Sequence, residues 1–264
     1  MSDWLVNLPV LWMTVIILAT TYVIAAGVYV LITTLAVGER AHSFKSISPG
    51  MLPPLAVVFA LLVGFLAAQV WTDVDRAKTA VNREASALRA IVLLAGGFPA
   101  DAETRLRELV RRHIQEAVTE EWPAMAGGNA TLTIIPAALQ ETLRVALALN
   151  PQTAGEVAAQ REIVASLQAA LDARRQRIIL SRSSIDWVKW AALVVQGCLT
   201  LVTIAMVHSH NREANRIILA IFATAAGAAI VLIAAHSHPF SGEIGISPAV
   251  LLQVMPEATQ PRDR

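Results

Sequence analysis

Hydrophobic residues in this chain gather into four long runs, and charged residues gather between the second run and the third. The runs cover residues 8–37, 51–72, 187–207 and 216–235. A helix needs about 20 apolar residues to cross a bilayer core of about 30 Å, so each run predicts a membrane-spanning helix. The first run is too long for the apolar region of a signal peptide, and no Lys or Arg precedes it.

Residues 73–186 carry the spacing of amphipathic helices instead of a continuous apolar run. Apolar residues recur every seven positions from residue 74 to residue 95, and Gly96-Gly97 ends that helix. Further helices are predicted over 101–121 and 136–149, and a last one from 153 that runs unbroken into the third span. The first and last of these helices should form an antiparallel stalk.

These patterns predict an all-α membrane protein with four transmembrane helices and a helical soluble domain inserted between the second and third. The predicted divisions are residues 1–72 for the first two spans, 73–186 for the soluble domain, 187–235 for the last two spans and 236–264 for a C-terminal tail.

Four crossings place both termini and the 73–186 domain on one side of the membrane. Five tryptophans fall toward that side, as one interfacial belt of aromatic residues requires; they are Trp4, Trp12, Trp71, Trp187 and Trp190. Lys and Arg are also more numerous beside the domain than in the opposite loops, which hold Arg40, Lys45 and Arg212. The positive-inside rule then predicts a cell-membrane protein with cytoplasmic termini and a cytoplasmic domain.

The overall composition agrees with a membrane protein and narrows its partners. Hydrophobic residues make up 55% of the 264 residues and charged residues only 16%, against about 25% charged in soluble domains. A net charge of +1 gives no reason to expect nucleic acid. The single cysteine, Cys198, excludes an internal disulfide and a Cys-rich metal site.

No catalytic or metal-binding motif stands out in the chain. The patterns HExxH, CxxC and GxSxG are absent. His208 and His210 are separated from His236 and His238 by the whole fourth span, roughly 30 Å of helix, so the four cannot form one site. We therefore predict no enzyme activity, no metal and no cofactor.

The second span has two different faces. At 100° per residue, small residues at 57, 60, 64, 67 and 68 share a face that suits close packing with neighbouring helices. The larger face is apolar and turns polar toward the domain, which fits the lining of a pore with a hydrophobic constriction; it holds Leu55, Phe59, Leu62, Leu66 and Gln69. The same large face would also suit simple contact with lipid.

Charges near the second span could form a vestibule that attracts anions. Arg76 and Lys78 lie just beyond the span, and Glu84 and Arg174 occupy apolar positions of the two stalk helices. Glu84 and Arg174 could form a buried or pore-facing charge pair, or they could form a structural salt bridge or reach to water.

Several segments together resemble one family, the bacterial bestrophin-like membrane proteins. They are Pro53-Pro54-Leu55, Phe59, Gly64-Phe65, Glu84-Ala85, residues 120–125 (EEWPAM) and residues 238–243 (HPFSGE). Bestrophins proper are pentameric anion channels with four spans per subunit, a helical cytosolic domain and a pore lined by the second span. The chain departs from them in having no acidic cluster after the fourth span, so calcium gating is not expected.

The resemblance implies a homo-oligomer, a pentamer by analogy, that conducts small anions across the lipid bilayer through a pore lined by the second span. The alternative is a non-conducting membrane scaffold or sensor whose helical domain docks a partner. The oligomeric state separates these hypotheses, because a monomer or dimer cannot surround a central pore with this helix.

Overall fold

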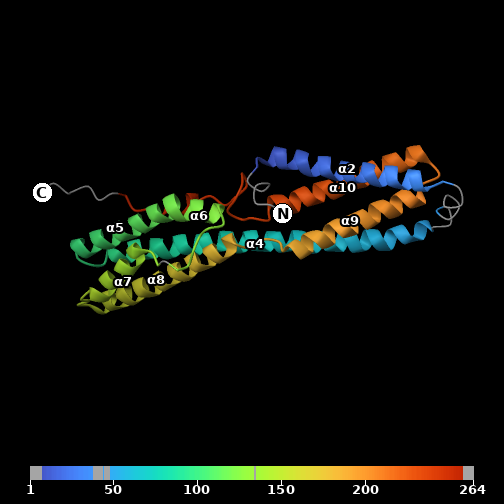
Figure 1. Cartoon of the computed structure of the whole chain (residues 1–264). Helices are drawn as coiled ribbons and strands as arrows, with labels where there is room; N and C mark the ends of the chain where they lie inside the picture. The colour runs from blue at the N-terminus through green and yellow to red at the C-terminus, as the bar shows by residue number, and fades with distance from the viewer. Residues whose placement is uncertain (1–7, 38–43, 45–47, 134, 258–264) are drawn as a thin grey trace. The chain divides into compact units, whose positions relative to one another are not determined.

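Every regular element in the described part of the chain is a helix (Figure 1). The structure is a computed structural model that describes residues 8–37, 44, 48–133 and 135–257. Its α-helices are α2 (Val10–Leu35), α4 (Leu52–Ala95), α5 (Ala100–Glu116), α6 (Trp122–Ala126), α7 (Ala137–Ala148), α8 (Ala154–Ser181), α9 (Trp187–Val207), α10 (Arg212–Ala235) and α11 (Ala249–Gln253).

Four of the helices are long and apolar enough to cross a membrane. They are α2, α9, α10 and α4 with the short 3-10 turn that precedes it, which together cover Pro49–Ala95. Pro53 and Pro54 fit the first turn of α4, where a helix needs no backbone N–H donor. The four predicted spans and the all-helical class are confirmed.

The described chain divides into two compact units. Unit 1 lies within residues 1–72, 184–238 and 242–244, and unit 2 lies within 73–183, 239–241 and 245–264. The single helix α4 contributes its apolar N-terminal part to unit 1 and its polar C-terminal part to unit 2.

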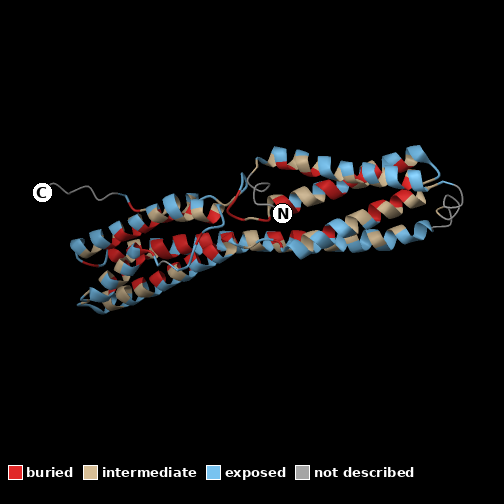
Figure 2. Cartoon of the chain, viewed as in Figure 1, coloured by how far each residue is buried: buried red, intermediate tan, exposed pale blue. Residues whose placement is uncertain are grey.

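Unit 1 consists of α2, the apolar part of α4, α9 and α10. The first turns of α2 pack with the end of α10, where Met13 and Ile17 meet Ala234. The last turns of α2 pack with the start of α10, where Ile32 shares a cluster with Leu219. The two helices are therefore antiparallel, and many apolar residues of unit 1 are exposed (Figure 2).

The described tryptophans of unit 1 lie at one end of it. The first turns of α2 and α9 share a cluster with the end of α10, and residues 66–70 of α4 pack against α9 near its start. Trp12, Trp71, Trp187 and Trp190 belong to these same turns, as an interfacial belt requires. Trp4 lies outside the described residues.

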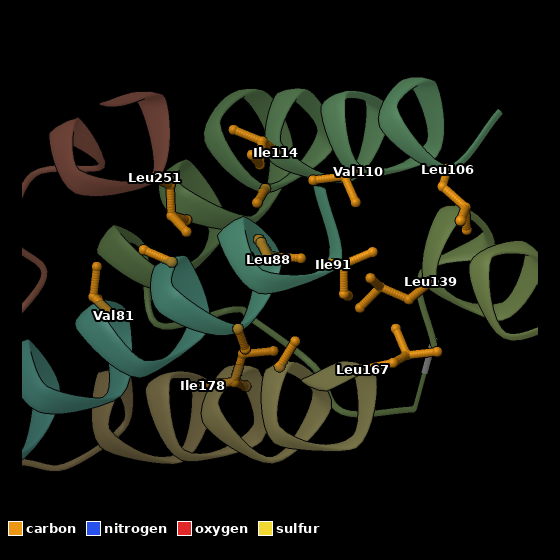
Figure 3. Packing of buried hydrophobic residues seen from close by; sticks show 14 of the residues in the cluster. Val81, Leu88, Ile91, Leu106, Val110, Ile114, Leu139, Leu167, Ile178 and Leu251 are labelled. Carbon is orange, nitrogen blue, oxygen red and sulfur yellow. The ribbon is translucent and has the colours of Figure 1, made fainter. Parts of the chain in front are cut away.

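Unit 2 is organised around the polar half of α4. Figure 3 shows Leu88 and Ile91 of α4 between Val110 of α5 and Leu167 of α8. Leu251 of α11 is buried in the same core, so part of the chain after the fourth span packs into unit 2. Gly242, at a φ of 75°, makes the tight turn that leads there.

The predicted continuous helix from residue 153 through the third span is wrong. α8 ends at Ser181 and α9 begins at Trp187. A serine side chain can form hydrogen bonds with nearby backbone groups, and these compete with the hydrogen bonds that would continue a helix. Ser183 donates to Asp73 Oδ2 at 3.1 Å, and Arg182 donates to the carbonyl oxygen of Ala130.

Two other predicted boundaries also shift. α10 begins at Arg212 rather than at residue 216, because Asn211 caps it by accepting a hydrogen bond from the Ala214 N–H at 3.1 Å. The predicted helix over 101–121 is interrupted near its end by one π-helical turn, Ala117–Glu121. Such turns often occur at functional sites.

Candidate functional site

The face of α4 that was predicted to line a pore is tied at both ends to α9 of the same chain. Gln196 donates its side-chain N–H to the Leu55 carbonyl oxygen at 3.2 Å. Lys189 Nζ donates to Gln69 Oε1 at 2.9 Å. These contacts hold this face of α4 against α9 within one subunit.

The middle of this face is packed as well. The ring of Phe59 lies 5.4 Å from the ring of Phe222 in α10, at an interplanar angle of 50°. A methyl group on Gly197 would meet Phe59 at 3.6 Å, so α9 approaches closely. Leu62 packs against the same cluster, in which Leu66 is buried. The large face thus supplies contacts between helices of unit 1.

The small residues of the second span were predicted to pack against neighbouring helices, and the structure corrects this prediction. Of the five small residues expected to pack, only Ala67 is buried, and the others are exposed. Both faces of a membrane helix are apolar, so periodicity separates the faces without showing which one meets protein and which one meets lipid.

α4 therefore presents an exposed face that the described residues of its own chain leave uncovered. The exposed fractions are 57% for Val57, 55% for Leu61 and 71% for Phe65. Ala68 and Thr72 extend the stripe and are also exposed. We call these five residues the free face of α4. It lies about 120° around the helix from the face that packs on α9.

The stripe continues as a polar surface in unit 2. Thr79, Asn82 and Ser86 follow it along the same helix, all exposed, and line a groove against α8 of about 810 Å³. The predicted vestibule residues Arg76 and Lys78 are exposed as well. Arg76 lies about 60° from the centre of the stripe and Lys78 about 100°.

Glu84 and Arg174, the other two predicted vestibule charges, are buried in unit 2. Their exposed fractions are 0% and 7%. Each makes an ion pair, but not with the other: Glu84 binds Arg177 at 2.8 Å and Arg174 binds Glu121 at 2.6 Å. Within the described chain both charges are therefore held in buried ion pairs with other partners, instead of the pair with each other that the sequence suggested.

Arg177 is the centre of this group, although its side chain is completely buried. Its Nε donates to Glu84 Oε2 at 2.8 Å, and its Nη2 donates to Glu84 Oε1 at 3.1 Å and to Glu121 Oε2 at 2.8 Å. The guanidinium carbon lies 4.7 Å from the centre of the Trp122 ring. We call Glu84, His113, Glu121, Arg174 and Arg177 the buried charge cluster.

His113 completes the cluster as a hydrogen-bond donor. Its Nε2 lies 3.1 Å from Glu84 Oε1, and its Nδ1 is buried without a hydrogen-bond partner among the described residues. A proton on Nδ1 would be buried without an acceptor, so this geometry favours the tautomer that is protonated on Nε2. In this cluster the carboxylates of Glu84 and Glu121 balance the charges of the guanidinium groups of Arg174 and Arg177.

The ion pairs of the buried charge cluster lower the pKa of Glu84 and raise the pKa of Arg177, in each case against the effect of burial. Glu84 lies 12 residues beyond Thr72, the last residue of the predicted span, which is about 18 Å along α4. Burial alone would raise the pKa of Glu84, but Arg177 and the hydrogen bond from His113 outweigh it and lower that pKa. Burial alone would lower the pKa of Arg177, and the carboxylates of Glu84 and Glu121 raise it instead.

Comparison with known proteins adds one positive finding. The model of the Bestrophin-like domain matches residues 19–251. The chain belongs to the bestrophin-like family. It is a membrane protein of that family, with α4 and the buried charge cluster both inside the matched region. The chain matches no curated protein sequence and no solved structure.

The two segments that carried most of the bestrophin-like resemblance meet in unit 2. Trp122 packs edge-on against Phe240, with ring centres 5.7 Å apart and an angle of 82°. The Trp122 indole N–H donates to the Ile246 carbonyl oxygen at 2.9 Å, and Ser241 Oγ donates to the Ala126 carbonyl oxygen at 2.7 Å. These contacts pack the C-terminal turn beside Trp122, whose ring covers Arg177.

Acid should destabilise this bestrophin-like protein through Glu84. Because the pKa of Glu84 is lowered in the folded state, the unfolded chain takes up this proton first as the pH falls. The stabilisation is complete above roughly pH 4.3, the ordinary pKa of Glu, and is lost below it. We expect the melting temperature of the purified protein to drop between about pH 5 and pH 3.

Two variants separate Glu84 from the other carboxylates. Glu84→Gln should show a shallower decline over this pH range, whereas the exposed Glu108→Gln should keep the slope of the unmodified protein. If the slope of Glu84→Gln is unchanged, carboxylates elsewhere cause the acid transition.

Sequence analysis missed three members of the cluster, His113, Glu121 and Arg177. Arg177 follows Arg174 by three positions, on the helix face that also buries Leu167 and Ser181. This three-residue spacing could have identified Arg177 as a further buried charge from the sequence. Glu121 had no such signal, because the π-helical turn shifts its direction relative to a regular helix.

Within the described residues, no group of three or more His, Cys, Asp and Glu side chains is placed to hold a metal ion. His208 and His236 each bond a carbonyl oxygen four residues earlier in their own helix, at 3.0 Å.

Proposed function

We propose that this bestrophin-like protein forms a homo-oligomeric anion channel whose pore is lined by the free face of α4. The observation that carries the proposal is an exposed stripe on one unbroken helix that is apolar over residues 57–68 and polar from Thr72 onward. A pore-lining face has to be left uncovered by its own subunit. This requirement favours the free face over Leu55, Phe59, Leu62, Leu66 and Gln69, which we now propose as its support.

Phe65 is the residue that we propose for the narrowest point. It has the highest exposed fraction among the large hydrophobic residues of α4. A ring of such side chains, one from each subunit, makes a hydrophobic constriction that can gate by dewetting. The polar residues Thr79 and Asn82 would line a wider, hydrated section beyond it.

Basic residues beside that polar section support anions as the permeating species. Arg76, Lys78 and Arg83 are exposed on α4 just beyond the span, and an oligomer repeats them around its axis. Repeated positive charge raises the local concentration of anions. Asp75 opposes this effect in part.

The family suggests five subunits, and the excess of basic residues beside unit 2 suggests that unit 2 is a cytoplasmic, water-facing domain.

Halide flux into proteoliposomes tests the proposal. The purified protein, Phe65→Ala, Phe59→Ala and empty vesicles are compared, after the oligomeric state of each protein has been measured. We expect flux above the empty vesicles, and a several-fold increase in Phe65→Ala because the variant widens the constriction. Phe59→Ala is the matched control, since it removes the same ring from the covered face.

Other results would change or reject the proposal. An increase in Phe59→Ala alone would return the pore lining to the face that packs on α9. Absence of flux from correctly folded oligomers, or a folded monomer, would reject conduction and favour the non-conducting scaffold or sensor.

A further inference from the structure

A groove of about 230 Å³ lies on the surface of unit 1 between α2 and α10. Three alanines and the buried Leu219 form its apolar floor, and large polar side chains form its ends. The residues that matter here are Tyr22, Ala25, Ala26 and Tyr29 of α2 with Arg216 and Ala220 of α10. The side chains of the three alanines are small, and this leaves the space that forms the groove. Both α2 and α10 are candidate membrane spans.

The two tyrosines mark the length of the groove. They are seven residues apart in α2, which corresponds to roughly 10 Å along the helix. The Tyr22 hydroxyl lies 2.7 Å from Thr224 Oγ1, and the Tyr29 hydroxyl accepts a hydrogen bond from Arg216 Nε at 3.0 Å. The groove is therefore closed by one bridge between α2 and α10 at each end.

Arg216 is held in place and keeps most of its hydrogen-bonding capacity. Its guanidinium carbon lies 5.3 Å from the centre of the Tyr29 ring, and its side chain is exposed. No carboxylate lies within ion-pair distance of it among the described residues. An arginine carries five N–H donors and a permanent charge, so the two Nη groups remain available to an anion.

The position of Arg216 along α10 sets the depth of this charge. It is the fifth residue of the helix, and the exposed residues Ile217 and Ile221 follow it toward the middle of the span. This places the guanidinium near the level of lipid headgroups, with the alanine floor below it at the level of acyl chains.

We propose that this groove binds a phospholipid with an anionic headgroup. Its phosphate oxygens accept hydrogen bonds from the Nη groups of Arg216, and one acyl chain lies along Ala25, Ala26 and Ala220. The groove is too small for a helix of a second subunit, whose diameter is about 10 Å. Free phosphate would gain nothing from the apolar floor, which makes up most of the groove.

Native mass spectrometry of the whole protein in detergent micelles tests this site. Dioleoyl phosphatidylglycerol, dioleoyl phosphatidylcholine and inorganic phosphate are titrated separately. We expect saturable binding of phosphatidylglycerol, weaker binding of phosphatidylcholine, and no competition from millimolar phosphate. Arg216→Gln should weaken the binding of phosphatidylglycerol by about tenfold, since it removes charge-assisted hydrogen bonds.

Two matched controls distinguish the groove from a general effect of charge or size. Arg212→Gln removes the same charge four residues earlier, outside the groove, and should leave binding nearly unchanged. Ala26→Phe fills the groove and should weaken binding, whereas Val23→Phe adds a ring at an exposed site of α2 that does not line it.

The proposal is overturned by any of three results. Equal losses in Arg216→Gln and Arg212→Gln would show only a positively charged flank. Unchanged binding in Ala26→Phe would exclude the acyl-chain groove. Equal binding of the two lipids, or displacement by phosphate, would exclude an anionic phospholipid as the specific ligand.

Discussion

Replacing Arg177 by methionine should lower the free energy of unfolding by about 3–5 kcal/mol, because Glu84 is then left charged and buried without its main partner. The Arg177 side chain is completely buried and bonds both Glu84 and Glu121. Stabilities of folded domains are commonly 5–15 kcal/mol, so this loss is a large fraction of the whole. Unfolding of the purified protein in detergent, followed by tryptophan fluorescence, measures it.

The neighbouring Arg175 provides the matched control. It lies two residues earlier on α8, is exposed, and Arg175→Met should change stability by less than about 0.5 kcal/mol. Combining Glu84→Gln with Arg177→Met should recover part of the loss, because the uncompensated carboxylate is gone. If Arg177→Met behaves like Arg175→Met, the buried charge cluster contributes nothing measurable to folding.

Gly227→Val should separate α2 from α10 and destabilise unit 1 by about 1–3 kcal/mol or more. A Cβ atom at Gly227 would lie 2.7 Å from Leu18 Cδ2 and 2.9 Å from Thr21 Oγ1. The leucine methyl can turn away, but Thr21 is β-branched, which restricts its movement. We expect a lower melting temperature and loss of folded protein during purification.

Gly27→Val is the control for the intrinsic cost of valine in a helix. A Cβ atom at Gly27 meets nothing within 4 Å, although this glycine is on α2 of the same helix pair. Adding Leu18→Ala to Gly227→Val should restore part of the stability by opening space. Equal effects of the two glycine substitutions would show that α2 and α10 do not need this close approach.

The covered and free faces of α4 show where sequence periodicity stops being informative. The period of the helix places Phe59 and Phe65 on different faces. In a soluble helix the larger apolar face would be the buried one, but a membrane solvates both faces of this helix. Packing of Phe59 against Phe222 decided the question, and the two residues are far apart in the sequence.

The buried charge cluster shows that sequence periodicity is also limited for polar residues. An apolar stripe interrupted by Glu84 and Arg174 left open whether these charges are buried, face a pore or reach to water, and the structure buries both. Their partners depend on the relative rotation of α4, α5 and α8. The π-helical turn before Trp122 changes that rotation for Glu121, so one regular period could not assign Arg174 to Glu121 and Arg177 to Glu84.

The sequence by itself determined the features that depend on local chemistry. Runs of about 20 apolar residues fixed the four candidate spans, and Gly96-Gly97 and Asn150-Pro151 fixed where helices end, because length, hydropathy and turn residues act within a few positions along the chain. The tertiary structure alone decided which side of α4 stays free, which charges pair around Arg177, and that Arg216 lies over Tyr29. Those features depend on the rotation and distance between helices, which a single helix does not encode.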